Sequence, residues 1–200
     1  GVLSAGSAIE MPWHYCCRAI LHGYLGGQAG AGAMLDVLTG KENPSGRLSE
    51  TYPIRYEDTP AFRNFPSTER NSEYRESIFV GYRYYDTSKV RVQYPFGYGL
   101  SYTEFTYSDL KVTDQGAEFV IANTGSMDGA EVAQLYVGAP NKRIFRPDKE
   151  LKGFQKVFLK AGEQKKVTIP LMIRPSVTGI QRRTPGRSKQ ESIRSISVPM

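Results

Sequence analysis

Apolar and polar residues alternate with a period of two through the second half of the chain. The alternating runs are short, and turn-forming residues, mainly Gly, Asn and Asp, separate them. Because successive side chains of a β-strand point to opposite faces, this pattern predicts strands with one buried face. Short strands at such spacing are typical of a β-sandwich. The predicted strands are 105–112, 117–122, 131–137, 150–159 and 164–171.

The first half of the chain has a different pattern. Val2 and Leu3 form the end of a predicted buried strand, and the apolar run 19–25 predicts a second one. Residues 26–40 open with small side chains and continue with apolar residues at helical spacing, which predicts a helix that stops at Gly40. Strands next to a helix make this half an α/β unit.

Three further segments follow that helix. Residues 43–53 read as a turn and then a short strand, since Asn43-Pro44 is a strong turn signal. Residues 54–75 are polar and aperiodic and predict a long surface loop. Residues 74–86 are predicted to be a strand with an aromatic face, which we expect to pack in the core rather than to stack on a sugar.

The two halves meet in the segment 94–105, Tyr-Pro-Phe-Gly-Tyr-Gly-Leu-Ser-Tyr-Thr-Glu-Phe, which we call the joint. Gly97 and Gly99 permit backbone angles that other residues resist, and Pro95 favours extended geometry before it. We therefore expect an α/β unit in residues 1–98 and a β-sandwich in residues 99–172. Residues 173–200 form an irregular basic tail.

Composition and charge exclude several classes of protein. Hydrophobic residues make up 40% of the chain and charged residues 23%, which is ordinary for a globular protein. Most of the net charge of +6 lies in residues 173–200, which carry +5 and contain no aromatic residue. A nucleic-acid-binding surface would combine basic and aromatic side chains, so we expect no nucleic-acid partner. No apolar run has the ~20 residues that span a membrane, so we expect no membrane partner either.

The cysteines and histidines do not suggest a metal centre. Cys16 and Cys17 are adjacent, and a disulfide between neighbours is strained. His14 and His22 have no carboxylate motif between them, so a zinc site is not expected. The first residues do not resemble a signal peptide, and a cytoplasmic location is favoured over secretion.

The glycine-rich stretch 26–32 invites comparison with phosphate-binding loops. Its spacing is not that of a dinucleotide fingerprint, and no Lys-Ser or Lys-Thr follows it. Tight packing between strand and helix explains the glycines better. Gln28 still follows the carboxyl end of a predicted strand, where open α/β sheets bind ligands.

Several motifs together resemble glycoside hydrolase family 3, the β-glucosidase-like enzymes. They begin with Asn-Pro-Ser-Gly-Arg-Leu at 43–48, after a helix that ends in Leu-Thr-Gly. Gly-Tyr-Arg-Tyr-Tyr-Asp and the joint resemble the segment between the family's second and third domains. The remaining motifs are Asn-Thr-Gly at 123–125, Gly-Ala-Glu-Val at 129–132 and Glu-Leu-Lys-Gly-Phe at 150–154.

The resemblance implies a partial α/β sandwich domain followed by an incomplete fibronectin type III-like β-sandwich. It also implies a parent enzyme that releases terminal β-linked sugars from oligosaccharides or glycosides, with retention and without a cofactor. β-Glucosidase and β-xylosidase activities are both compatible with it. Such hydrolysis uses two carboxyl groups.

In this family the nucleophile is an Asp of an N-terminal barrel domain, and the general acid is a Glu in a loop that would precede Val2. Neither has a counterpart in the sequence, so the resemblance implies a chain without catalytic residues and without its barrel domain. The loops that contain Ser7 and Gln28 are then candidates for the edge of the sugar site.

The end of the chain departs from the family pattern. A sandwich of this type needs about seven strands, whereas the sequence predicts five before residue 172. A shift of the reading frame after Leu171 is one hypothesis for this difference. It predicts a disordered tail and an unfinished sandwich with exposed strand edges.

Two other interpretations of the sequence stay open. The chain is in one of them a standalone binding module that presents Tyr and Phe side chains to glycans or proteins. In the other it is a small independent enzyme that uses Glu10 or Glu76. Saturable sugar binding by the chain alone favours the first, and turnover of an aryl β-glucoside that is lost on Glu→Gln substitution favours the second.

Overall fold

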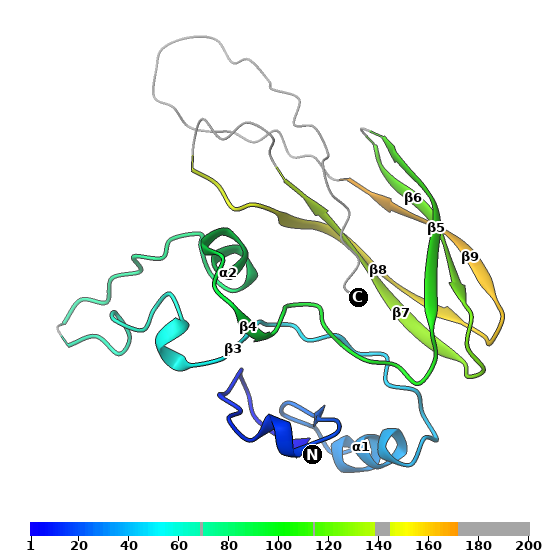
Figure 1. Cartoon of the computed structure of the whole chain (residues 1–200), viewed down its shortest axis with the longest axis horizontal. Helices are drawn as coiled ribbons and strands as arrows, with labels where there is room; N and C mark the ends of the chain where they lie inside the picture. The colour runs from blue at the N-terminus through cyan, green and yellow to red at the C-terminus, as the bar shows by residue number, and fades with distance from the viewer. Residues whose placement is uncertain (69, 114, 139–144, 172–200) are drawn as a thin grey trace, which may run out of the picture.

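The computed structural model describes residues 1–171, apart from residues 69, 114 and 139–144 (Figure 1). The predictions for the tail therefore lie outside the described residues. Thirteen elements follow one another within the described residues. They are β1 (Val2–Leu3), η1 (His14–Cys16), β2 (Leu21–His22), α1 (Gly30–Leu38), β3 (Tyr52–Pro53), η2 (Tyr56–Asp58), α2 (Tyr82–Ser88), β4 (Val92–Tyr94), β5 (Phe105–Thr113), β6 (Gly116–Asn123), β7 (Gly129–Val137), β8 (Glu150–Leu159) and β9 (Gln164–Pro170).

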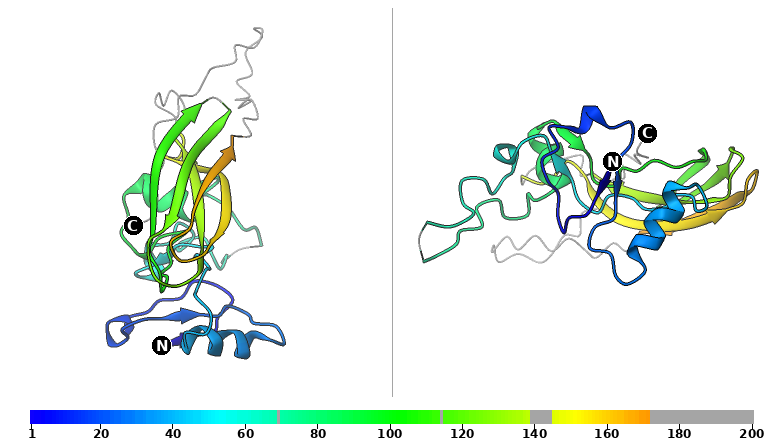
Figure 2. Two further views of the ribbon diagram at one scale, coloured as in Figure 1. Left: turned by 90° about the vertical axis from the view of Figure 1, so that its right-hand side faces the viewer. Right: turned by 90° about the horizontal axis from the view of Figure 1, so that it is seen from below.

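The N-terminal elements β1, β2 and α1 lie together at one end of the molecule, and strands β5–β9 extend away from them (Figures 1 and 2). β1 and β2 pair in parallel, with Val2 opposite Leu21. α1 confirms the predicted helix, although it begins only at Gly30. Gly40 has a φ of 76° and ends the helix, as expected for a left-handed stop residue.

The strand predicted for 19–25 is shorter than expected, because only Leu21 and His22 pair with β1. The tight packing predicted for the glycine-rich stretch is also limited. A Cβ atom on Gly26 would lie 3.2 Å from the Cα of Gly30, whereas Gly27 and Gly32 face open space. Gly23 makes the closest approach to α1, against the sulfur of Met34.

The strand predicted for residues 74–86 is wrong: Tyr82–Ser88 form helix α2. The alternation of Tyr82, Arg83 and Tyr84 ends at Tyr85. Tyr82 and Tyr85 are three apart, so both project from one face of a helix. The Tyr82 ring contacts Phe96 with 5.1 Å between centroids. Tyr85 is 5% exposed, which confirms a core position for this part of the aromatic face.

All five strands predicted in the second half are present, and they form two sheets. β5, β6 and β9 form one antiparallel sheet, with β6 in the centre. β7 and β8 form the other. The core between the sheets consists of apolar residues at alternate positions of β6–β9: Ala117, Phe119, Ile121, Ala133, Leu135, Val157, Leu159, Val167 and Ile169. The period-two pattern is thus confirmed as the signal for these strands.

The joint lies against the segment that contains the Asn-Pro-Ser-Gly-Arg-Leu motif. The amide of Gly97 donates to the carbonyl of Leu48, and the amide of Leu48 donates to the carbonyl of Tyr98, both at 2.8 Å. Gly97 has a φ of 81°, a region that favours glycine. A Cβ atom on Gly99 would lie 2.7 Å from the carbonyl oxygen of Gly46. Both glycines of the joint are therefore required by its close packing.

A buried ion pair connects the two halves of the molecule. The Arg47 guanidinium binds the Glu131 carboxylate on β7, with side chains 11% and 7% exposed. The Tyr107 hydroxyl on β5 donates to the same carboxylate at 3.2 Å. Burial, together with the negative charge of Glu131, raises the pKa of Tyr107. Arg47 thus has a structural role.

Two further contacts hold the joint and α2 to the sandwich. The Asn43 side-chain amide donates to the carbonyl of Asp128 at 3.0 Å and accepts from the Ser101 hydroxyl at 2.9 Å. The amide of Leu151 on β8 donates to the Tyr82 hydroxyl at 2.7 Å. No helix in the described part of the chain is long and apolar enough to cross a membrane.

Candidate functional site

Two loops lie side by side where the parallel strands β1 and β2 end. One follows Leu3, and the other runs from Gly23 to the start of α1. The Gly23 amide donates to the carbonyl of Leu3 at 2.8 Å, and the Ser4 hydroxyl donates to the carbonyl of Tyr24 at 3.0 Å. The carboxyl ends of parallel strands are where open α/β sheets bind ligands. The structure therefore brings the two candidate loops to a single edge.

The two residues predicted for the edge of the sugar site, Ser7 and Gln28, belong to these loops. Ser7 lies in the first loop and Gln28 in the turn before α1, and both side chains are exposed. Gly6 packs against Leu25, with 3.3 Å from its ideal Cβ position to Leu25 Cδ1. The loops are thus in contact through residues next to Ser7 and near Gln28. Both side chains are free to face solvent or a ligand.

His22 makes hydrogen bonds that hold this edge of the β1–β2 sheet in place. Its Nε2 atom donates to the carbonyl of Ala5 at 3.1 Å, because a carbonyl can only accept. Its Nδ1 atom then accepts a hydrogen bond from the Tyr52 hydroxyl. The ring also stacks on Tyr24, with 3.8 Å between centroids.

Tyr52 is the buried partner in this cluster, with 1% of its surface exposed. Burial raises the pKa of Tyr52, and the neighbouring Tyr24 adds to the effect. Its hydroxyl therefore stays protonated across the neutral pH range. Strand β3, which contains Tyr52, is thus connected to the first loop by the hydrogen bonds of His22 to the Tyr52 hydroxyl and to the carbonyl of Ala5.

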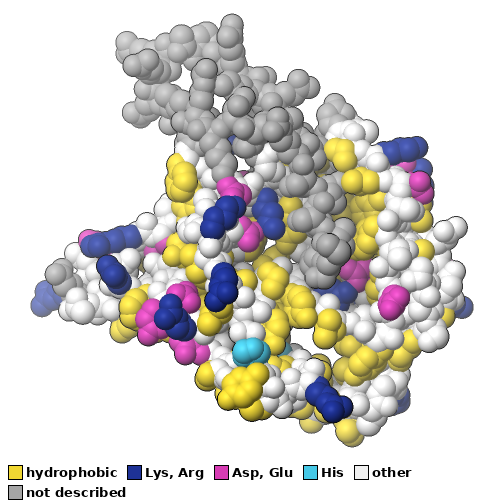
Figure 3. Space-filling view, in the orientation of Figure 1, with side chains coloured by type: hydrophobic (Ala, Val, Ile, Leu, Met, Phe, Trp, Pro, Cys, Tyr) yellow, Lys and Arg dark blue, Asp and Glu magenta, His cyan; other side chains and the backbone are white. Residues whose placement is uncertain are grey.

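A large open cavity of about 800 Å³ lies between β1–β2, α1 and the joint. Its lining is mainly apolar and includes Leu3, Leu21, Val37, Leu38, Tyr98 and Tyr102. Hydrophobic side chains are exposed over the end of the molecule that holds these elements (Figure 3). None of the α1 residues is buried. This end of the α/β unit is apolar surface that its own elements leave uncovered.

Family comparisons cover both halves of the chain. Residues 1–102 match the glycosyl hydrolase family 3 C-terminal domain, and residues 131–177 match the fibronectin type III-like domain. The chain belongs to glycoside hydrolase family 3. This confirms the resemblance in the motifs, and the mixed architecture agrees with a family 3 C-terminal domain followed by a fibronectin-like sheet.

Relatives with curated names have related but different activities. Thermostable β-glucosidase B of Acetivibrio thermocellus is 48% identical over 178 residues, which cover 85% of this chain and 24% of that protein. The exo-α-(1→6)-L-arabinopyranosidase of Bifidobacterium breve is 45% identical over 85% of this chain and 23% of its own length. This family 3 chain therefore spans about a quarter of the length of the curated relatives it matches.

A solved relative has the same fold. The crystal structure of the β-glucosidase from Kluyveromyces marxianus in complex with glucose superposes with a TM-score of 0.78 at 45% identity. The superposition covers 85% of this chain and 21% of that one.

The carboxylates considered for an independent active site lie in different surroundings. Glu10 accepts a hydrogen bond from the amide of Tyr56. One oxygen of Glu76 is buried without a hydrogen-bond partner among the described residues. Retaining hydrolysis needs two carboxyl groups about 5–5.5 Å apart. The hydrogen bond from Tyr56 connects Glu10 to the start of η2.

The sequence indicated the two candidate loops, but it did not reveal the cluster of His22, Tyr24 and Tyr52 that contacts them. It considered His22 only as a metal ligand and gave no role to Tyr24 or Tyr52. His22 and Tyr52 are 30 residues apart, and their contact depends on how β2 packs against β3. No local spacing signals such a contact.

Proposed function

We propose that this family 3 chain is the C-terminal part of a retaining β-glucosidase-like hydrolase that acts on terminal β-linked sugars. The observation that supports the proposal is the match of both halves to the family over about a quarter of the relatives' length. In this proposal the catalytic carboxyl pair and the barrel domain belong to the rest of the enzyme. The substrate is an oligosaccharide or glycoside, and no cofactor takes part.

In this proposal, Ser7 and Gln28 line the edge of the sugar site. They are exposed on adjoining loops at the carboxyl ends of β1 and β2, and His22 and Tyr52 fix the position of these loops. A hydroxyl and an amide suit this role because both donate and accept hydrogen bonds, as sugar hydroxyls do. The His22–Tyr52 cluster supports the edge without contacting the substrate.

A chimera tests these roles. This chain would replace the corresponding quarter of β-glucosidase B, and turnover would be measured with aryl β-glucoside, β-xyloside and α-L-arabinopyranoside. We expect Ser7→Ala and Gln28→Ala to raise KM several-fold, since each lost hydrogen bond is worth about 0.5–1.5 kcal/mol. Lys166→Ala on β9 is the matched surface control, with its side chain 64% exposed. Equal KM values for all three variants would remove Ser7 and Gln28 from the site.

A further inference from the structure

Tyr24, the second residue after strand β2, has a backbone conformation that is unusual for its side chain. Its φ is 48°, in the left-handed region that glycine adopts most readily. Four described non-glycine residues have a positive φ, and Tyr24 is the one aromatic residue among them. A bulky residue in this region is an outlier, and such conformations persist only where the surrounding contacts determine them. The contacts around Tyr24 therefore hold the chain in this turn.

Two contacts keep Tyr24 in place. Its ring stacks on His22, with 3.8 Å between centroids and 23° between the ring planes. Its carbonyl accepts a hydrogen bond from the Ser4 hydroxyl at 3.0 Å, so the loop that contains Ser7 is bonded to the backbone of Tyr24. The Tyr24 hydroxyl is buried and has no hydrogen-bond partner among the described residues. The ring, rather than the hydroxyl, thus accounts for the contribution of this side chain.

The turn at Tyr24 directs Leu25 toward the first loop. An ideal Cβ atom on Gly6, the residue before Ser7, would lie 3.3 Å from Leu25 Cδ1, so the two loops touch at this point. A negative φ at Tyr24 would send Leu25 in another direction, because rotation about φ moves all of the chain that follows. The spacing of the two loops therefore depends on the backbone of Tyr24.

Gln28 lies in a tight turn that continues into α1. The amide of Gly30 donates to the carbonyl of Gly27 at 3.0 Å and closes this turn. Gly26 packs close to Gly30, with 3.2 Å from its ideal Cβ position to the Gly30 Cα. The segment from Tyr24 to Gln28 is short and is held at both ends, so the position of the Gln28 side chain follows from the turn at Tyr24.

We propose that Tyr24 is a positioning residue that couples the loops of Ser7 and Gln28, so that both side chains meet one sugar. The inference rests on the proposed function, which assigns Ser7 and Gln28 to the edge of the sugar site. The ring of Tyr24 holds the turn on His22, and the turn sets the spacing of the two polar side chains. In this role Tyr24 acts through Gln28 and does not contact the substrate.

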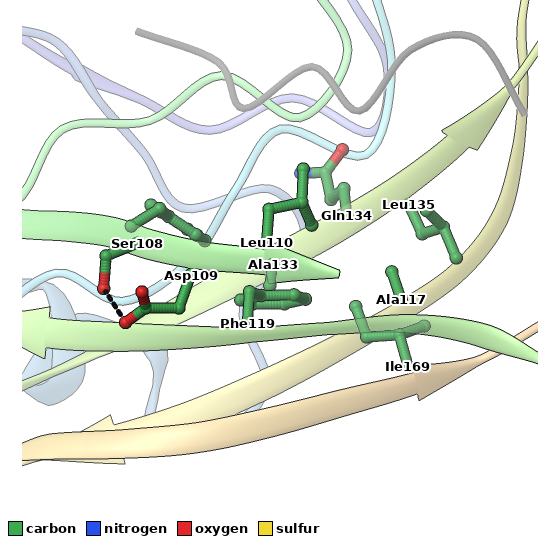
Figure 4. A pocket seen from close by; sticks show the side chains of 10 residues that line it. Ser108, Asp109, Leu110, Ala117, Phe119, Ala133, Gln134, Leu135 and Ile169 are labelled. Atoms are coloured by element: carbon green, nitrogen blue, oxygen red, sulfur yellow. Dashed lines mark hydrogen bonds between the residues drawn. The ribbon is translucent and has the colours of Figure 1, made fainter. Parts of the chain in front are cut away.

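The first test measures hydrogen exchange by NMR in the full chain. Tyr24→Gly keeps the left-handed backbone accessible but removes the ring, whereas Tyr24→Phe keeps the ring. We expect the Gly30 amide to exchange several-fold faster in Tyr24→Gly and at the parent rate in Tyr24→Phe. Asp109→Gly is the matched control, because Asp109 also has a positive φ, of 55°, and is exposed on β5 in the other half of the molecule (Figure 4). Unchanged exchange in Tyr24→Gly, or equally fast exchange in Asp109→Gly, would overturn the proposal.

The second test is a double-mutant cycle in the chimera with β-glucosidase B. Gln28→Ala should raise KM several-fold in the parent chimera but leave it unchanged in Tyr24→Gly, where the displaced Gln28 no longer reaches the sugar. In the Tyr24→Phe background the full effect of Gln28→Ala should return. We expect the same kcat throughout, because a lost contact that binds substrate and transition state equally changes KM alone.

The cycle separates failure of this inference from failure of the proposed function. If Gln28→Ala leaves KM unchanged in the parent chimera, the edge role of Gln28 is wrong, and the coupling role of Tyr24 is wrong with it. If Gln28→Ala raises KM equally in the parent and in Tyr24→Gly, only the role of Tyr24 is wrong. A lower kcat at unchanged KM in Tyr24→Gly would indicate loss of folded enzyme and would also contradict the positioning role. If Tyr24→Gly does not fold in the chimera, hydrogen exchange in the full chain decides.

Discussion

Arg47, Glu131 and Tyr107 show how single residues hold the two halves together. Each comes from a different segment: the turn before β3, strand β7 and strand β5. The sequence motifs contain Arg47 and Glu131, but local patterns cannot pair residues 84 positions apart. The buried charges of Arg47 and Glu131 compensate each other only while both side chains are present, because an isolated buried charge is strongly unfavourable.

Glu131→Ala should therefore lower the free energy of unfolding by roughly 3–5 kcal/mol, because it leaves the Arg47 charge buried without a partner. Urea unfolding followed by circular dichroism measures the change. The control is Asp36→Ala, which breaks an exposed pair with Lys41 and should cost less than about 1 kcal/mol. Similar losses in the two variants would contradict the role assigned to burial.

Buried tyrosines make the free energy of unfolding depend on pH in the alkaline range. Burial raises the pKa of Tyr85 to about 12, whereas an unfolded tyrosine ionises near pH 10. The folded state thus holds a proton that the unfolded state has lost, so stability is full below about pH 10 and falls as pH rises toward 12. Unfolding at a series of pH values should show a shallower fall for Tyr85→Phe. Tyr15→Phe, at a site 79% exposed, should leave the slope unchanged.

At the scale of elements, the local periodicity of apolar residues was sufficient to predict the strands of the sandwich. All five strands of the sandwich were predicted. Burial alternates along β6 and β9, whereas β7 is buried almost throughout and the second half of β5 is exposed. α2 was missed, because its aromatic residues resemble a β-strand in composition and its helical face forms only through tertiary contacts with Phe96 and Leu151. The loops that contain Ser7 and Gln28 follow the carboxyl ends of the parallel strands β1 and β2, a position that strand direction determines, while their role at a sugar site stays a prediction.

The conformation and close packing of the joint depend on its two glycines. Gly97→Ala should destabilise the protein by more than about 1 kcal/mol, since φ is positive there and the new methyl group would meet the Gln134 side chain. Gly27→Ala is the control, because that position has open space around it and should be nearly neutral. Thermal unfolding of both variants measures the difference. A Gly97→Ala protein as stable as the parent would show that the joint tolerates other backbone angles.

The described residues leave two faces of the molecule uncovered. At one end, α1 exposes Leu35 and Leu38, by 59% and 53%, beside a parallel pair of two-residue strands. Parallel sheets are otherwise found with both faces buried. At the other end, the described sandwich has five of the roughly seven strands expected. Both faces agree with a chain that spans about a quarter of its relatives' length.

The most direct test of the account is the turnover of an aryl β-glucoside by this chain alone, compared with the chimera that restores the preceding three quarters of β-glucosidase B. We predict no turnover by the isolated chain and turnover with retained anomeric configuration by the chimera, because the proposal assigns the catalytic carboxyl pair to the rest of the enzyme. Turnover by the isolated chain that Glu10→Gln or Glu76→Gln abolishes would contradict the account and establish an independent active site.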